Sequence, residues 1–313
     1  MKREYGLDQV ERDPNSVVTV GTFDGIHRGH QAILQYLRTR AAERHGASVV
    51  VSFDPHPREI VKGESVLLLT TIDERADLLE RIGIDRFIVV PFTKDFARLT
   101  AEAFVSDVLI SRIGLKEIVV GHDHGFGRGR MGDRALLEVL GREHGFTVDV
   151  IPSQVVEEHV VSSTEIRRLL IEDGNVQLAA EMLGRNYSLQ GEVVHGDGRG
   201  RLIGFPTANI QILNPRKVIP RKGVYAVIVS MPGHDDEHYE GMLNIGERPT
   251  FNGSGLRVEV NLLDYTGDLY GRMLRIEFVR WMRDERKFES VEALIEQLSE
   301  DKRRCKETLE SLF

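Results

Sequence analysis

The chain changes its pattern of secondary structure near residue 185, and this change most constrains what it can fold into. Before that point, short β-branched runs alternate with segments of helical periodicity, and the expected strands are 16–21, 47–53, 85–92, 116–121 and 147–152. Strands that alternate with helices predict a parallel α/β sheet. We therefore expect residues 1–184 to form an α/β domain.

After residue 185, strand-like segments follow one another with no helix between them, at 187–196, 223–231, 239–246, 256–265 and 273–282. Turns containing Gly, Pro, Asn and Asp separate them. This pattern predicts an antiparallel barrel or sandwich. Ser290 then caps a long amphipathic helix that closes the chain. Residues 185–313 are expected to form a second domain, as a length of 313 residues also favours.

The charge balance limits the partners. With 41 Lys and Arg against 49 Asp and Glu, the net charge is −8, which argues against general binding to nucleic acid or a membrane surface. No apolar run is long enough to span a membrane, and the charged N-terminus is not signal-like. Cys305 is the single cysteine, so no disulfide forms within the chain. We expect a cytoplasmic protein acting on small molecules, its oligomeric state left open.

Two histidines lie where the first expected strand gives way to a helix. His27 and His30 fall on the first helical turn, where free N–H groups and the helix dipole favour an anion. Three residues apart, they share a face, and Gly29 between them allows a close approach of the backbone. The pattern predicts a phosphate site.

The stretch GTFDGIHRGHQAIL at 21–34, together with FDPHPRE at 53–59, resembles the adenylyltransferase half of the prokaryotic bifunctional riboflavin kinase/FAD synthetases. This resemblance implies a Rossmann-like HxGH nucleotidylyltransferase domain. In it, His27 and His30 would hold the triphosphate of ATP and stabilise adenylyl transfer, with Gly21, Phe23 and Asp24 shaping the turn. His56, between two prolines, would belong to the flavin side, although a loop histidine of no catalytic role is the alternative.

Two further segments continue this resemblance. SSTEIRRLL at 162–170 starts like a helix, because Ser162 and Glu165 fit a capping box. The family likeness adds Ser163, Thr164 and Arg167 as triphosphate contacts.

The loop 120–133, which contains Asp123, Phe126 and Arg128, is cationic and rich in glycine, as suits a phosphate or ribityl group. A glycine-rich surface turn is the alternative. The family usually has an aromatic residue and an arginine where this chain has His124 and Gly125.

The segment GDGRGRLIGFPTANI at 196–210 resembles the flavokinase signature. Its four glycines would wrap phosphates with backbone N–H groups; they are Gly196, Gly198, Gly200 and Gly204. Thr207 and Asn209 offer the hard oxygen ligands that suit Mg²⁺ on a nucleotide. A plain hairpin turn is the alternative for the glycines alone.

Glu259 is expected on a strand that also presents Asn261 on the same face. The resemblance makes Glu259 the general base for the 5′-hydroxyl of riboflavin. From the residues alone, a solvent-facing glutamate is the alternative. The family usually has histidine where Asn261 stands. Trp281 is not assigned to a site, because a lone tryptophan is more often core or interface.

The resemblance covers essentially the whole chain and implies two activities. The barrel would phosphorylate riboflavin with ATP to FMN, and the first domain would join FMN to AMP from a second ATP, giving FAD and pyrophosphate. Both steps would use Mg²⁺. Two alternatives stay open: a riboflavin kinase with a lost or redirected transferase domain, and a flavin or nucleotide sensor without turnover.

Overall fold

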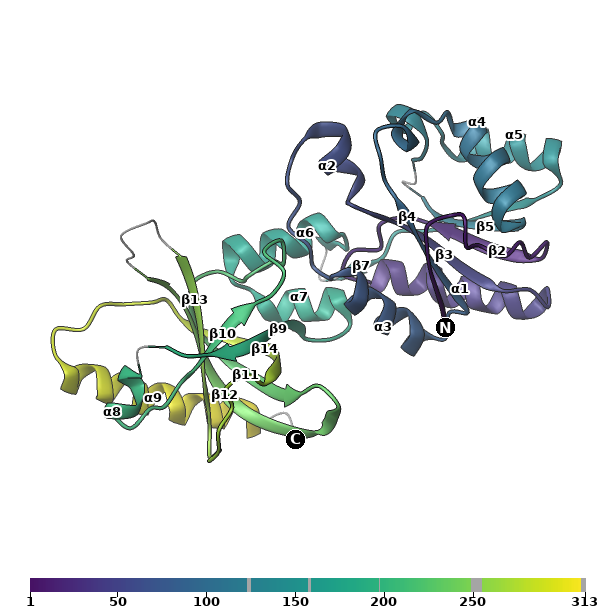
Figure 1. Ribbon diagram of the computed structural model, residues 1–313. Coiled ribbons are helices and arrows are strands. Elements are labelled where there is room, and N and C mark those ends of the chain that lie inside the picture. The colour runs from purple at the N-terminus through teal and green to yellow at the C-terminus, as the bar shows by residue number, and fades with distance from the viewer. Residues whose placement is uncertain (123–124, 157–158, 197, 249–254, 311–313) are drawn as a thin grey trace. The chain divides into compact units, whose positions relative to one another are not determined.

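The computed structural model describes residues 1–122, 125–156, 159–196, 198–248 and 255–310. The chain forms two compact units, Met1–Ser163 and Thr164–Phe313 (Figure 1). The expected boundary at 184/185 stays a prediction about the functional domains.

The first unit is built on a six-stranded parallel sheet in the order β1-β4-β3-β2-β5-β6. Its strands are β1 (Lys2–Tyr5), β2 (Ser16–Val20), β3 (Ser48–Asp54), β4 (Arg86–Pro91), β5 (Leu115–Gly121) and β6 (Thr147–Ile151). The five expected strands and the parallel sheet are confirmed. β1 was not expected, because its sequence KREY is charged; its Glu4 is only 2% exposed and accepts a hydrogen bond from Arg86 Nε at 2.9 Å.

Helices cover both faces of this sheet. They are α1 (Arg28–Glu43), α2 (Pro57–Lys62), α3 (Ile72–Ile82), η1 (Phe96–Arg98), α4 (Ala101–Ala103), the π-helix η2 (Phe104–Ile113), η3 (Arg128–Arg130) and α5 (Arg134–His144), with the short hairpin β7 (Val155–Val156) and β8 (His159–Val160). Along β2, Val17 packs with α1 and α3, while Val18 packs with η2 and α5. Burial on both faces explains the nearly continuous apolar strands.

The strand order reverses at β2, whose neighbours are β3 on one side and β5 on the other. In open α/β sheets, ligands bind outside the carboxyl ends of the strands at such a switch point. Here the end of β2 leads directly into the turn that carries His27 and His30. The topology thus places the HxGH motif at the position where open α/β sheets bind their ligands.

Away from that edge, Glu117 of β5 is a fully buried carboxylate. It accepts hydrogen bonds from Arg40 Nε at 2.7 Å, from Arg44 Nε and from the Thr147 hydroxyl at 3.3 Å. Burial alone raises the pKa of Glu117, but the hydrogen bonds from Arg40 and Arg44 outweigh it and hold the pKa below its ordinary value. This network ties α1 to β5.

Replacing Glu117 by glutamine is expected to lower the free energy of unfolding of the first unit by about 3 kcal/mol at pH 7, because two arginines lose their buried partner. Since the folded-state pKa is lowered, the stabilisation is complete above the unfolded value of 4.5 and disappears as the pH falls through the folded value. Urea unfolding followed by circular dichroism at several pH values measures this. Glu43→Gln, which removes a surface partner of Arg40, is the control; an unchanged difference at acid pH would contradict the assignment.

The second unit is a closed antiparallel barrel in the order β10-β13-β12-β11-β14-β9. Its strands are β9 (Tyr187–Val194), β10 (Ala208–Ile212), β11 (Gly223–Met231), β12 (His234–Arg248), β13 (Gly255–Leu262) and β14 (Met273–Arg283). The five expected strands are confirmed, and the alternative of a sandwich is wrong. β10 was not expected; it is short, carries polar residues and begins two residues after Pro206.

The described helical segments of the second unit are α6 (Ser163–Arg168), η4 (Leu169–Asp173), α7 (Val176–Leu183), α8 (Arg199–Leu202) and α9 (Val291–Glu310). The first residue of α6, Ser163, is assigned to the first unit. α7 packs on β9 and β14, and α9 packs on β11, β12 and β14. The expected cap is present, since Ala293 N donates to the Ser290 hydroxyl at 3.1 Å. Asp301 on α9, 1% exposed, pairs with Arg283 of β14 at 2.6 Å. These contacts fasten α9 to the barrel.

Candidate active sites

The turn after β2 is organised around the buried carboxylate of Asp24. It accepts hydrogen bonds from the backbone N–H groups of Leu69 at 3.0 Å and Thr70 at 2.8 Å, and it lies 3.7 Å from the guanidinium of Arg75. Ser163 Oγ donates to the Asp24 carbonyl at 2.9 Å. Asp24, the residue expected to shape the turn, thus connects the turn to the segment 69–75 and to Ser163.

His27 and His30 lie together at the N-terminus of α1. His27 is the N-cap residue, and its Nδ1 accepts a hydrogen bond from the backbone N–H of His30 at 3.3 Å. Their rings stack with centroids 3.6 Å apart, and the ring of Phe23 lies 4.9 Å from that of His30. A Cβ at Gly29 would lie 3.2 Å from the His27 ring, so a side chain there would crowd the imidazole. The structure brings together the residues that the motif predicted.

His30 Nδ1 is buried and has no hydrogen-bond partner among the residues that the structure describes. Burial, followed by the nearby His27 and Arg75, holds the pKa of His30 well below its ordinary value. His30 is therefore neutral at pH 7. A buried, unpartnered nitrogen beside a helix N-terminus can be satisfied by a ligand, and a phosphate oxygen is the group that this position favours.

The remaining predicted residues of the first site are less concentrated. His56 is the N-cap residue of α2, and its Nδ1 accepts from Arg58 N at 3.1 Å. Thr164 and Arg167 lie on α6 in the second unit. Their contacts with a nucleotide stay predictions.

The loop after β5 differs from the expectation in one respect. The Phe126 ring is buried in the core, 6.2 Å from the ring of Phe104, so it packs the loop against the core. Arg128 is exposed. Asp123 and His124 lie outside the described residues.

An aromatic cluster at the carboxyl ends of β3 and β4 was missed. Phe53, Phe92 and Phe96 contact one another with ring centroids 5.3 to 5.9 Å apart, and all three are partly exposed. Sequence reasoning gave no signal for it, because the rings come from separate segments. The rings are tilted or edge-on to one another, with interplanar angles of 52° to 75°, and form a small aromatic cluster at this edge of the sheet.

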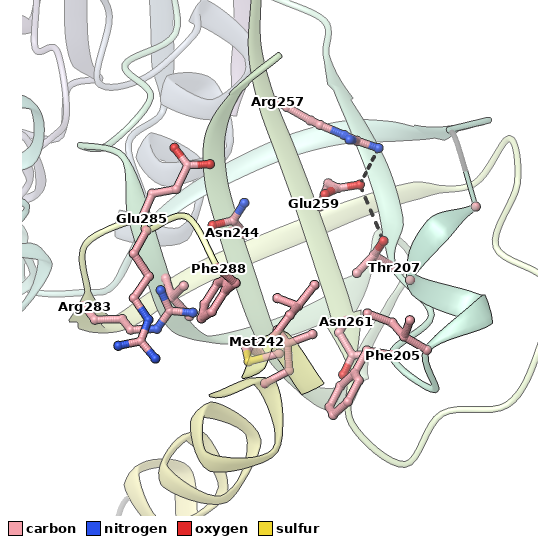
Figure 2. Close-up of a pocket in the computed structure, with 17 residues that line it drawn as sticks. Phe205, Thr207, Met242, Asn244, Arg257, Glu259, Asn261, Arg283, Glu285 and Phe288 are labelled. Atoms are coloured by element: carbon pink, nitrogen blue, oxygen red, sulfur yellow. Dashed lines mark hydrogen bonds and ion pairs between the residues drawn. The ribbon is translucent and has the colours of Figure 1, made fainter. Parts of the chain in front are cut away.

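The barrel contains a pocket of about 310 Å³ (Figure 2). Thr207, Asn244, Arg257 and Glu259 supply polar groups, and an apolar wall comes from Phe205, Val224, Met242, Phe288, Leu294 and Leu298. Gly198 and Gly200 also line it, whereas Gly196, Gly204 and Asn209 do not. The predicted kinase residues Thr207 and Glu259 thus line one pocket. Asn209 does not line it but contacts Arg257, which does.

Glu259 lies at the centre of a polar row across three strands. On β13 it stands opposite Asn209 of β10 and Asn244 of β12. The Thr207 hydroxyl donates to its Oε1 at 3.5 Å, and Arg257 Nη2 lies 2.8 Å from the same oxygen. Figure 2 shows Arg257 and Thr207 on either side of this carboxylate. Glu259 lines the pocket, so the alternative of a solvent-facing strand glutamate is not what the structure shows.

Asn261 contacts the segment that leads into β10. Its side chain is buried, and Nδ2 donates to the Pro206 carbonyl at 2.5 Å. The amide thereby holds the segment that carries Thr207. Gly196 is required nearby, because a Cβ there would lie 2.0 Å from Asn209 Nδ2.

Several pocket residues were missed by sequence reasoning. Arg283, Glu285, Arg286 and Phe288 come from the end of β14 and the segment that leads to α9. Arg286 lies over the Phe288 ring, 4.9 Å from its centroid. Trp281 is not among the lining residues; it packs near Gly174 and Gly223 instead.

Within the described ranges, no group of three or more His, Cys, Asp or Glu side chains is placed to hold a metal ion. The oxygens of Thr207, Glu259 and Asn209 form a different donor set, of the hard type that Mg²⁺ prefers. Over the same residues, no helix is long and apolar enough to cross a membrane.

A histidine pair at the switch point of a parallel sheet, in one chain with a barrel pocket that holds a carboxylate, defines a nucleotidylyltransferase joined to a kinase-type barrel. Residues 9–165 match the family model of FAD synthetase, and residues 183–309 match that of riboflavin kinase. The chain belongs to the family of bifunctional riboflavin kinases/FMN adenylyltransferases, the family that the sequence motifs resembled.

Relatives support this assignment over nearly the full length. The bifunctional riboflavin kinase/FMN adenylyltransferase of Escherichia coli K12 is 40% identical over 98% of this chain and 97% of its own. That of Listeria monocytogenes is 38% identical over 92% of this chain and 91% of its own. A crystal structure described as a macrolide-efflux protein from Streptococcus pneumoniae has a TM-score of 0.89 at 32% identity, covering 98% of this chain and 99% of that one.

Proposed function

We propose that this riboflavin kinase and FMN adenylyltransferase makes FMN in the barrel pocket, with Glu259 as base, and FAD at the turn that carries His27 and His30. The single observation that carries the kinase assignment is the position of Glu259, between the Thr207 hydroxyl and the apolar wall of the pocket. The family supplies the two activities; the residue roles are our proposal.

In the kinase reaction, the apolar wall suits the flavin ring, and Glu259 accepts the proton of the 5′-hydroxyl as that oxygen attacks the γ-phosphate of ATP. Gly198 and Gly200 offer backbone N–H groups to the phosphates. Thr207 and Asn209, with Glu259 close by, are the oxygen donors that fit Mg²⁺. When bound there, the ion would neutralise phosphate charge.

In the adenylyltransferase reaction, the phosphate of FMN attacks the α-phosphate of ATP and pyrophosphate leaves. Catalysis of this step depends on positioning and charge stabilisation rather than covalent chemistry. His30 Nδ1 and the free N–H groups of α1 supply donors for the triphosphate. Ser163, Thr164 and Arg167 are proposed to complete the site. The partly exposed rings of Phe53, Phe92 and Phe96 would pack on the flavin.

The acidic charge balance and the single cysteine favour a cytoplasmic enzyme that acts on riboflavin, FMN and ATP without nucleic-acid or membrane partners. A redirected transferase is the second candidate, favoured by the departure at His124 and Gly125.

A time course with riboflavin, ATP and Mg²⁺, with the flavins separated by chromatography, tests the proposal. FMN that rises before FAD appears supports both assignments. FMN alone would favour a lost or redirected transferase, and flavin binding without any product would favour a sensor.

A further inference from the structure

Three side chains of β13 contact the segment 206–209 at successive positions. Arg257, Glu259 and Asn261 are two residues apart, so all three point to the pocket face of the strand. They contact Asn209, Thr207 and the Pro206 carbonyl, respectively. The Glu259 carboxylate is the middle group of the three, and the nitrogen donors of Arg257 and Asn261 lie on either side of it.

Arg257 makes two of these contacts with one guanidinium group. Its Nη2 lies 2.8 Å from Glu259 Oε1, and its Nε donates to Asn209 Oδ1 at 3.1 Å. A guanidinium is planar and its donors have fixed directions, so both acceptors are oriented together. Arg257 is 27% exposed and Glu259 18%, so water screens the pair less than a surface pair.

We propose that Arg257 is a positioning residue for phosphoryl transfer, which fixes the orientation of the Glu259 carboxylate and aligns the Asn209 amide beside it. This inference depends on the proposed role of Glu259 as base. A base must be correctly placed to accept the hydroxyl proton, and a misplaced group loses most of its effect. Arg257 acts through these two neighbours rather than on the riboflavin hydroxyl.

Other polar and charged groups also surround Glu259 in the described part of the pocket. From β10 and β12 it faces Thr207, Asn209 and Asn244, which are neutral. From the end of β14 and the following segment, Arg283, Glu285 and Arg286 line the same pocket.

The two arginines among these pocket residues have contacts on α9. Arg283 pairs with Asp301, and Arg286 donates to Gln297. Glu285 faces β12, since a Cβ at Gly246 would lie 2.4 Å from its Oε1.

The barrel offers a matched control. Arg275 and Glu277 of β14 form the same type of pair, also two residues apart, at 3.1 Å and with 21% and 29% exposure, but neither lines the pocket. Arg275→Met removes a comparable strand ion pair from elsewhere on the barrel. The single tryptophan, Trp281, lies on β14, so its fluorescence reports whether the barrel of each variant is folded.

The experiment measures kcat and KM of FMN formation for wild type, Arg257→Met, Arg257→Lys and Arg275→Met. For Arg257→Met we expect kcat to fall roughly 10- to 100-fold, with KM for riboflavin and ATP changed less than about 3-fold. Arg257→Lys should restore part of kcat, since it keeps the charge but lacks the planar fork of donors. Arg275→Met should leave both quantities unchanged.

The possible failures are distinguishable. If Glu259→Gln keeps kinase activity, the proposed function of Glu259 is wrong. If Glu259→Gln is inactive but a folded Arg257→Met keeps the wild-type kcat, only the role of Arg257 is wrong. A large rise in KM for ATP with an unchanged kcat would make Arg257 a phosphate ligand and overturn the positioning role. Should Arg257→Met not fold, a folded Arg257→Lys with wild-type kcat would overturn it too.

Discussion

Replacing His30 by alanine should reduce FAD formation roughly 1000-fold or more while FMN accumulates unchanged. The substitution removes the ring that stacks on His27 and the buried Nδ1 that has no partner among the described residues. Because the buried imidazole is neutral, it contributes as a directed donor rather than as a charge. The loss should fall on kcat and kcat/KM of the adenylyltransferase step alike. Chromatography of riboflavin, FMN and FAD after single additions of substrate measures both steps in one sample.

His144→Ala is the control for this variant, because His144 is an exposed histidine of the same unit, at the end of α5. It should keep both activities. If His30→Ala slows FMN formation in a folded protein as much as FAD formation, the assignment of separate sites is wrong.

Glu259→Gln is expected to have the second large effect. The amide keeps the size of the carboxylate but cannot accept a proton, so FMN formation from riboflavin should fall roughly 1000-fold. It also removes the partner of Arg257 at 2.8 Å. FMN added directly should still be converted to FAD at the wild-type rate, since His27 and His30 are unchanged. Initial rates with riboflavin and with FMN as separate substrates measure this.

Glu277→Gln serves as the control for Glu259→Gln, because Glu277 pairs with Arg275 away from the pocket. Kinase activity near the wild-type level in Glu259→Gln would show that this carboxylate only orients the hydroxyl or is not involved.

The sequence predicted the elements that local composition defines. Strands such as β3 and β11 are β-branched runs bounded by turn residues, and both were found. β1 is charged and is stabilised as a strand by its pairing with the distant β4 and by the contact between Glu4 and Arg86, which no local pattern encodes. β10 was not predicted for a similar reason. It is stabilised by pairing with two other strands, β9 before it and β13 after it in the sequence.

The same distinction holds for the sites. Residues that lie within one motif, such as His27 with His30, were found because their spacing alone brings them together. Arg257 and Phe288 reach the pocket through strand register and through the docking of α9, so local sequence gave no signal for them. Phe126 was predicted to belong to a ligand-binding loop, but its ring packs against Phe104 in the core.

The terminal helix has a consequence for the chemistry of the only thiol. Cys305 lies on the buried face of α9, where burial, with Asp301 nearby, raises its pKa to about 12. The same helix supplies Leu294 and Leu298 to the wall of the pocket. Protection of the sulfur from alkylating reagents and the shape of the flavin cavity therefore depend on one docking event. A fluctuation that lifts α9 would expose the sulfur and dismantle the cavity together, so the thiol is a built-in reporter of whether the kinase half is competent.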